Sequence, residues 1–197
     1  MSWLEKLFKN SKQQTKEDKK IEINKKQVPV DEVFVNNLKK NGGIFIYCES
    51  ISEIVETIGK IVAENVKNIK LSCYNDYLKS ILPENYFRFF TNIDAQATFF
   101  LTDCEYLLAN DGSVMFSSKQ LGSKQISELP PSLIVVAKAS QIVGNIGDGM
   151  KGIMQRPKEE RPENIRSIKN FQTKEKDTIM YGSCSRKLYL LLLEDLN

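Results

Sequence analysis

The amino-acid sequence predicts an α/β fold with a mostly parallel central sheet and helices on both faces. Residues 133–137 (LIVVA) form an uninterrupted apolar run, which is typical of a strand buried on both faces. Residues 187–193 (KLYLLLL) form a second run of this kind. Apolar runs at 44–48 and 69–72 flank a segment with helical spacing, and a strand, a helix and a strand in this order require a crossover that makes the two strands parallel.

The helices of this fold have recognisable starts and ends in the sequence. Residues 31–41 carry apolar side chains at near-helical spacing and are expected to form a helix. Ser50 and Glu53 match a capping box, which opens a second helix that we expect to end near Val66. A short helix is expected over 76–81. Each of these helices can cover one face of the sheet.

A tight hairpin is predicted in the middle of the chain. Two short apolar runs, 106–109 and 114–116, are separated by residues that tolerate positive φ or bond to their own backbone. These residues are Asn110, Asp111, Gly112 and Ser113. We therefore expect two strands around a polar turn.

A glycine-rich helix is expected after the 133–137 strand, with Ser140 as its N-cap and its end near Met154. Each glycine inside a helix costs about 1 kcal/mol relative to alanine, so we expect another backbone or a ligand to approach this helix closely. The G-x-x-G-x-G spacing resembles a phosphate-binding fingerprint but lies within the helix, so close packing is the favoured explanation. The glycines are Gly144, Gly147, Gly149 and Gly152.

Length and charge separate the chain into an arm, residues 1–28, and one folded domain, residues 29–197. The 197 residues suit a single soluble domain, and no apolar run is long enough to span a membrane, so a cytoplasmic protein is expected. The arm has eight lysines and four acidic residues, so the domain has a net charge near −1. This charge argues against nucleic-acid binding by the domain. The arm begins with an amphipathic pattern around Trp3, which is expected to dock on its own domain or an oligomer neighbour, with a partner or membrane surface as the alternative.

The chain contains no histidine, which removes the usual general base and the commonest metal ligand. The four cysteines lack C-x-x-C spacing, so we expect reduced thiols and assign neither a metal nor a cofactor. Cys184 lies between small polar residues and near Arg186, a setting that lowers a thiol pKa. Without a histidine to activate this thiol, no catalytic residue is assigned.

Several of these features together resemble the LUD domain, the family of lactate-utilisation protein C. The resemblance rests on the order of polar turn, strand, Leu-Pro-Pro segment and apolar strand, and on the turn itself. The family turn usually reads Ala-Glu-Thr-Gly-Thr, and residues 109–113 here read Ala-Asn-Asp-Gly-Ser. The family's later Gly-x-His-Gly-Pro segment is matched only in outline by residues 181–185, which read Tyr-Gly-Ser-Cys-Ser. The chain is therefore similar to a divergent LUD domain.

This resemblance implies a fold like that of ribose-phosphate isomerases and CoA transferases. Related enzymes use a glutamate for covalent or proton-transfer chemistry, and an amide at Asn110 supplies neither a nucleophile nor a base. The resemblance implies an accessory or ligand-sensing protein that works with iron–sulfur oxidoreductase subunits in lactate utilisation, with oligomers allowed. Two alternatives remain: an acyl or phosphosugar enzyme with a degraded site around Asp111, Ser113 and Ser183, and a module recruited through its N-terminal arm.

The candidate binding residues for a small anionic ligand lie in three polar segments. Two of them follow predicted strands, where ligands bind to open parallel sheets, and the third can present backbone amides to an anion. The candidates are Asn110, Asp111, Gly112, Ser113, Ser140, Gln141, Gly182, Ser183 and Cys184.

Overall fold

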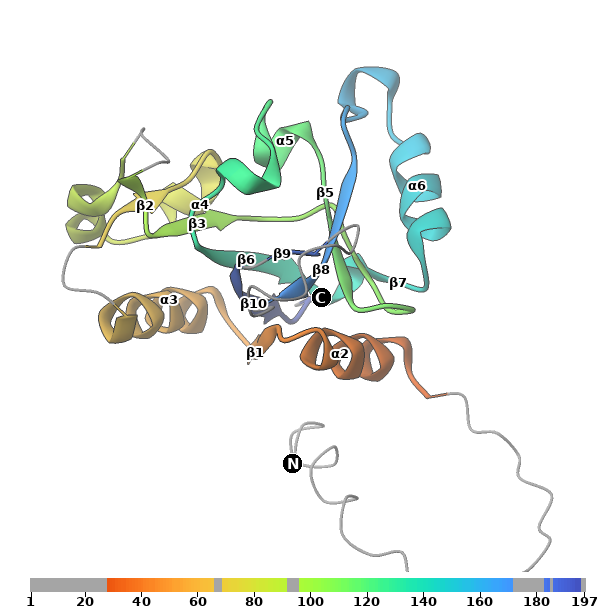
Figure 1. Ribbon diagram of the computed structural model, residues 1–197, viewed down its shortest axis with the longest axis horizontal. Helices are drawn as coiled ribbons and strands as arrows, with labels where there is room; N and C mark the ends of the chain where they lie inside the picture. The colour runs from red at the N-terminus through yellow and green to blue at the C-terminus, as the bar shows by residue number, and fades with distance from the viewer. Residues whose placement is uncertain (1–27, 66–68, 92–95, 172–182, 185, 196–197) are drawn as a thin grey trace, which may run out of the picture.

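A computed structural model of the chain describes residues 28–65, 69–91, 96–171, 183–184 and 186–195. Within these residues the strands form two five-stranded sheets (Figure 1). Every pairing in the first sheet is parallel, and the strand that contains residues 133–137 lies at its centre. In spatial order the first sheet consists of β1 (Ile44–Cys48), β10 (Lys187–Leu193), β6 (Ser132–Lys138), β3 (Phe99–Thr102) and β2 (Leu71–Ser72).

The second sheet is mixed and contains the predicted hairpin. β4 and β5 pair antiparallel, with Tyr106 opposite Met115, and β5 pairs antiparallel with β8. The pairs of β4 with β7 and of β8 with β9 are parallel. In spatial order this sheet consists of β7 (Ile142–Val143), β4 (Tyr106–Leu108), β5 (Ser113–Phe116), β8 (Arg166–Phe171) and β9 (Ser183–Cys184).

Two stretches of chain connect the sheets directly. β3 leads into β4 and β6 leads into β7, and the two stretches are neighbours in both sheets. Where they bend, the Gln141 Nε2 atom donates hydrogen bonds to the carbonyl oxygens of Cys104 (2.6 Å) and Glu105 (3.2 Å). The side chain of Gln141 thus bridges the two stretches at the junction.

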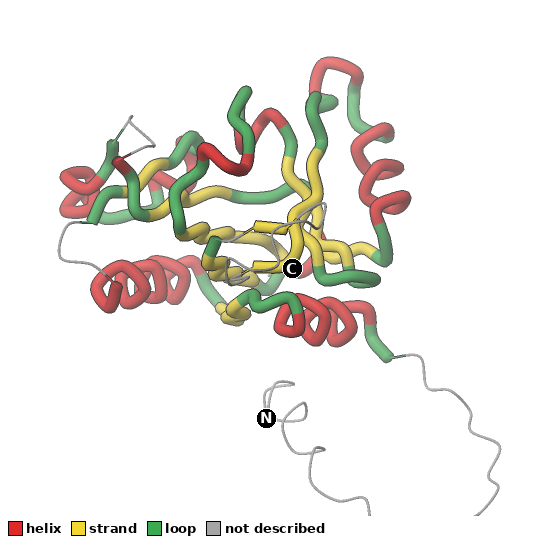
Figure 2. The backbone as a smooth tube through the Cα atoms, in the orientation of Figure 1, coloured by secondary structure: helices red, strands yellow, loops and turns green. Residues whose placement is uncertain are grey.

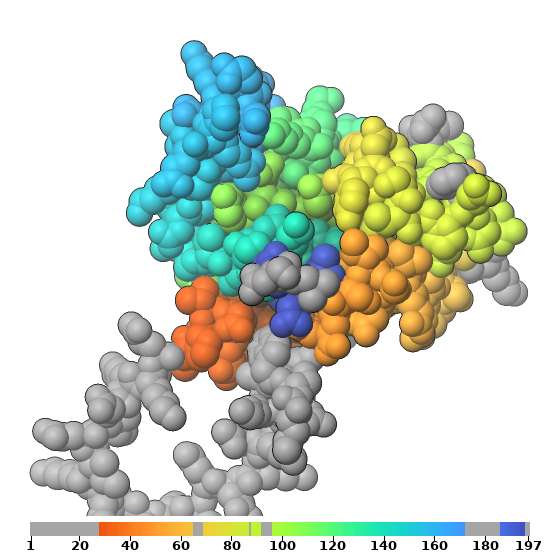
Figure 3. Space-filling model, turned by 180° about the vertical axis from the view of Figure 1, so that it is seen from behind, coloured from red at the N-terminus to blue at the C-terminus, as the bar shows by residue number. Residues whose placement is uncertain are grey.

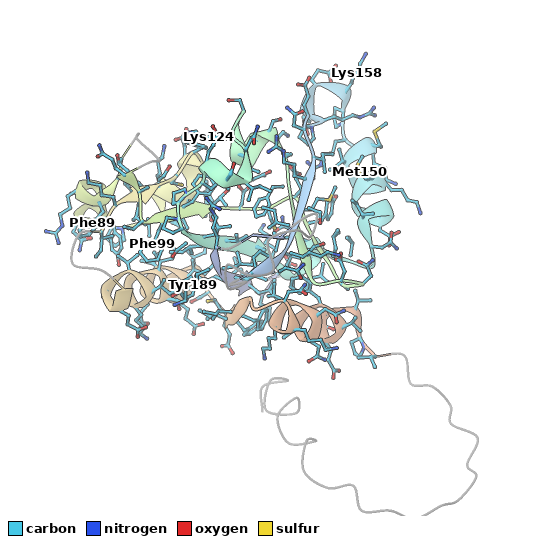
Figure 4. All side chains as sticks on the ribbon, viewed as in Figure 1. Phe89, Phe99, Lys124, Met150, Lys158 and Tyr189 are labelled. Carbon is cyan, nitrogen blue, oxygen red and sulfur yellow. The ribbon has the colours of Figure 1, made fainter. Side chains whose placement is uncertain are left out.

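Alternating side chains of the central strands face two separate cores, as expected for a strand buried on both faces. On β6, Leu133 and Val135 face the core between the two sheets, which α2 (Val30–Lys40) closes, whereas Ile134 faces α3 (Ile51–Asn65). Phe99 and Tyr189 lie on the α3 side (Figure 4). The order of layers is therefore α3, first sheet, second sheet with α2, and α6 (Ile146–Met154) on the outer face of the second sheet (Figure 2).

The predicted fold class is confirmed, and the structure adds the mixed second sheet. The Ser50 hydroxyl accepts a hydrogen bond from the Glu53 amide and opens α3, as the capping box predicted. The predicted short helix is α4 (Asp76–Ser80). The remaining short helices are η1 (Glu84–Phe89), α5 (Ser118–Leu121), η3 (Ile126–Glu128), η4 (Ala139–Gln141) and η5 (Lys158–Glu160). No helix among the described residues is long and apolar enough to cross a membrane.

The prediction that Ser140 caps the glycine-rich helix is wrong. Ser140 lies in η4, the chain then forms β7, and α6 begins at Ile146 with Asn145 as its N-cap. The Asn145 side chain accepts hydrogen bonds from the Gly147 and Asp148 amides. Residues 142–143 pair with β4 instead of forming helix, because the neighbouring strand supplies their hydrogen-bond partners.

Close packing of α6 through its glycines is confirmed. A Cβ atom on Gly152 would lie 2.1 Å from the Tyr106 hydroxyl, and one on Gly149 would lie 3.0 Å from the Met115 sulfur. Both neighbours belong to the β4–β5 hairpin. Because these glycines lack side chains, the helix can lie directly on the outer face of the second sheet.

Candidate functional site

The polar turn between β4 and β5 is fixed against helix α2. Gly112 has φ +68°, and a Cβ atom there would lie 2.4 Å from the backbone of Asn37 and Leu38. The Asn37 side-chain amide donates to the carbonyl oxygen of Ala109 (2.8 Å), and the Asn41 side-chain amide donates to that of Asp111 (2.6 Å). Glycine is therefore required both by the backbone conformation and by the close approach of a helix.

The Asp111 side chain is held within the same turn. Its Oδ1 atom accepts hydrogen bonds from the Ser113 amide (3.1 Å) and hydroxyl (2.6 Å), while Oδ2 lies 3.3 Å from Nζ of Lys169. The Ser167 hydroxyl lies 2.8 Å from that of Ser113. We call Asp111, Ser113, Ser167 and Lys169 the polar cluster.

Strand pairing assembles the polar cluster from two distant parts of the chain. β5 and β8 are antiparallel with Val114 opposite Ile168, and both of these residues face the core between the sheets. Because side chains alternate along a strand, Ser113, Ser167 and Lys169 share the opposite, outer face. Ser113 is fully buried, whereas the Lys169 and Asp111 side chains are 41% and 35% exposed, so the charged end of the cluster meets solvent.

A distortion of β8 lies beside the polar cluster. Lys169 is in register with Ser183 and Phe171 with Cys184, so the intervening Asn170 is extra and forms a bulge. Asn170 has φ +59°, a left-handed conformation that asparagine tolerates better than most residues. The β9 backbone thus lies next to the strand that carries Lys169, on the side of β8 away from β5.

Two of the predicted site residues, Ser140 and Gln141, do not join this cluster. Ser140 and Gln141 lie at the start of β7, beside the beginning of β4, whereas the turn follows the end of β4. Gln141 fills the junction between the sheets, and the Ser140 amide donates to the Asp195 carboxylate. Gly182 lies outside the described residues, as do the side chains of Ser183 and Cys184.

A buried ion pair lies at the other end of the hairpin. The Glu105 carboxylate, 3% exposed, accepts a hydrogen bond from the Ser117 hydroxyl (2.6 Å) and forms an ion pair with the Arg156 guanidinium (2.6 Å). Burial alone raises the pKa of Glu105, but the bonds from Ser117 and Arg156 outweigh burial and hold the pKa below its ordinary value. This carboxylate is therefore ionised and fully engaged, and it ties the hairpin to the segment that follows α6.

Comparison with known proteins agrees with this architecture. The family model described as the LUD domain matches residues 32–182. The chain belongs to the LUD domain family. The crystal structure of a DUF162 family protein from Deinococcus radiodurans is similar to the chain, with a TM-score of 0.57 and 14% identity over 83% of this chain and 96% of that one. That likeness concerns the fold alone, and no curated protein matches the chain.

The cysteines that the structure describes in this LUD domain are buried thiols. Burial raises the pKa of Cys73 to about 11, and it also raises the pKa values of Cys48 and Cys104. The Arg186 guanidinium, expected from the sequence to lower the pKa of Cys184, donates to the carbonyl oxygens of Ser127, Leu129 and Pro130. No cluster of acidic or cysteine side chains suited to a metal ion occurs within the described part of the chain.

We expect at most one thiol of the native LUD domain to react with a thiol reagent at pH 8. The three described cysteines are buried with raised pKa values, and the thiolate is the reactive form. Titration with Ellman's reagent should give up to one thiol per native chain and four per chain in denaturant. Rapid reaction of two or more thiols in the folded protein would contradict the burial of these cysteines.

Several residues of these networks were not predicted from the sequence. Ser167 and Lys169 could have been recognised, because polar residues two apart on a strand mark its solvent-facing side. No local sequence signal indicates the pair of Glu105 and Arg156, because the two residues are 51 positions apart and both residue types are ordinarily on the surface.

Proposed function

We propose that this LUD-domain chain is an accessory protein that binds a small anionic ligand and does not catalyse a reaction alone. The observation that carries the proposal is the environment of Asp111, whose two carboxylate oxygens are engaged by Ser113 and Lys169. Both oxygens are occupied by groups of the protein itself, so neither is free to take a proton from a substrate or to attack a substrate atom.

The composition of the turn supports the same conclusion. Asn110 occupies the position at which the family turn usually has glutamate, and it is exposed. Its amide cannot take a proton from a substrate or form an acyl intermediate. The chain has no histidine that could replace the missing base. Acid–base chemistry at the turn would therefore depend on Asp111, which is already engaged.

The polar cluster has the chemistry to bind a carboxylate or phosphate. The Lys169 ammonium is partly exposed and can donate three hydrogen bonds, and Ser167 lies on the same outer face of β8. Binding would move Lys169 from Asp111 to the incoming anion, so the carboxylate competes with the ligand. For a LUD protein in lactate utilisation, lactate itself is the first ligand to test, with inorganic phosphate as the second.

The test of ligand binding uses the melting temperature of the full chain in increasing concentrations of sodium lactate or phosphate, at constant ionic strength. We expect the wild type to be stabilised by mass action and Lys169→Met to lose this stabilisation. Asp111→Asn should retain or strengthen it, because the competing charge is removed. Lys60→Met, on the exposed face of α3, is the matched control and should behave as wild type.

The outcomes separate the proposal from an enzyme with a degraded site. Such an enzyme would need Asp111, so loss of stabilisation in Asp111→Asn would favour the enzyme. Stabilisation that survives in Lys169→Met would mean that the ligand binds elsewhere. Flat melting curves for the wild type with both anions would overturn the ligand-binding half of the proposal.

The accessory half of the proposal concerns partners. We propose that the chain acts in the cytoplasm beside iron–sulfur oxidoreductase subunits, which supply the redox chemistry of lactate oxidation. The purified chain should then be inert with lactate and an electron acceptor, and affinity purification from its native cells should recover iron–sulfur proteins. Turnover by the purified chain alone would contradict this role.

A further inference from the structure

Helix α6 presents an apolar stripe to solvent. Ile146, Met150 and Met154 are 50%, 36% and 55% exposed, and they follow one another at intervals of four residues. At 100° per residue these three side chains span roughly 80° of the helix surface. Among the described residues, no other helix exposes three large apolar side chains. Figure 4 places Met150 on α6, at the edge of the molecule.

The fold itself does not need this stripe. The side of α6 next to the stripe is already packed, with Gly149 and Gly152 against Met115 and Tyr106, and with Ile153 buried. The helix is therefore held in place by one face while the adjacent face remains apolar and exposed. Methionines on an exposed helix face are typical of surfaces that bind amphipathic segments.

The N-terminal arm begins with an amphipathic sequence pattern. Residues 1–8 place Trp3, Leu4, Leu7 and Phe8 at spacings of three and four, which is the anchor pattern of a helix that binds an apolar groove. Residues 9–27 connect this segment to the start of α2, and they carry lysines and polar side chains with few large apolar ones. The segment is thus an apolar ligand on a polar tether.

The tether begins on the same side of the molecule as α6. Helix α2 contacts β7, and α6 follows β7 after two residues. The start of α2 and α6 lie at the same end of the molecule in both views (Figures 1 and 3). Residues 9–27 can span up to about 60 Å when extended, so residues 1–8 can reach the stripe.

We propose that residues 1–8 dock on the α6 stripe of their own chain. Tethering gives the segment an effective concentration on the order of millimolar, so a weak contact suffices. A stable dimer buries about 800 Å² on each partner, which three partly exposed side chains cannot supply by themselves. The stripe therefore suits an intramolecular apolar segment better than a second copy of the domain.

Trp3 provides a direct measurement, because it is the only tryptophan of the chain. In the full-length wild type, its emission should be blue-shifted and protected from acrylamide. Met150→Lys and Met154→Lys should each shift the emission to longer wavelength and increase quenching, with the fold checked by circular dichroism. Tyr77→Lys is the matched control, because Tyr77 is 59% exposed on α4 and should leave the emission unchanged.

A reciprocal measurement guards against indirect effects of these substitutions. Trp3→Ser should increase the rate at which hydrogen peroxide oxidises Met150 and Met154, read by mass spectrometry, because undocking uncovers their sulfur atoms. Trp3 emission that is solvent-exposed in the wild type overturns the proposal. Protection of Trp3 that disappears on dilution would also overturn it, because it indicates binding to a second copy. Protection that requires anionic lipid vesicles would overturn it as well, because it indicates a membrane surface.

Discussion

Gly112→Ala should destabilise the domain by at least about 3 kcal/mol, which is among the larger effects of a single substitution. Two costs combine at this position. The backbone has φ +68°, where an L-amino acid is strained, and the new methyl group would lie 2.4 Å from the α2 backbone. The backbone atoms of Asn37 and Leu38 cannot move aside as a flexible side chain could, so the turn must separate from α2. Urea denaturation gives the free energy of unfolding for the comparison.

Gly122→Ala is the matched control for this prediction. Gly122 also has a positive φ, +60°, but nothing lies within 4 Å of the position of its Cβ. Its substitution therefore carries only backbone strain, of order 1–3 kcal/mol. If Gly112→Ala proved no more harmful than Gly122→Ala, the close contact between the turn and α2 would be wrong.

Arg156→Met should cost about 3 kcal/mol at neutral pH. The substitution leaves the Glu105 carboxylate buried without its counter-ion, and breaking a buried pair in this way costs about 3–5 kcal/mol. The lower end applies here because the Arg156 side chain is 28% exposed and partly screened by solvent. Lys60→Met removes a cation from the exposed pair with Glu56 and should leave the denaturation midpoint unchanged.

The effect of Arg156→Met should depend on pH with a definite sign. In the wild type the pKa of Glu105 is lowered, so its ion pair contributes stability above the ordinary carboxyl pKa of 4.5 and loses it as the pH falls further. In the variant, burial raises the pKa of Glu105 and the carboxyl group takes up a proton sooner. The stability difference between the two proteins should therefore shrink from pH 7 towards pH 4. A difference that stays constant over this range would argue against the buried pair.

Local patterns predicted the parts of the fold that depend on near neighbours. The β6 run, the capping box at Ser50 and the polar turn at Gly112 could each be recognised within a few residues. The error at Ser140 has the opposite cause. Ile142 and Val143 fit a helical pattern, but β4 lies beside them and takes up their backbone hydrogen bonds. A strand partner more than 30 residues away cannot be read from a local window.

Of the polar cluster, the sequence predicted the turn but not the residues that surround it. Its turn was recognisable because asparagine, aspartate, glycine and serine have strong local preferences. Lys169, the only cation in the polar cluster, reaches Asp111 through the pairing of β8 with β5. The role of Gly112 depends on α2, which lies some 70 residues earlier in the chain. Tertiary contacts thus give the turn both its rigidity and its cation.

We propose that the hairpin turn of this LUD domain binds an anion through Lys169 instead of acting through a carboxylate. The most direct test is a titration of the ¹⁵N-labelled chain with lactate and with phosphate, followed by amide chemical shifts. We predict saturable shifts confined to residues 111–113, 167–170 and 183–184. Shifts centred instead on the carboxyl ends of β1, β6 and β10, around Glu49, Lys138 and Glu194, would contradict the claim.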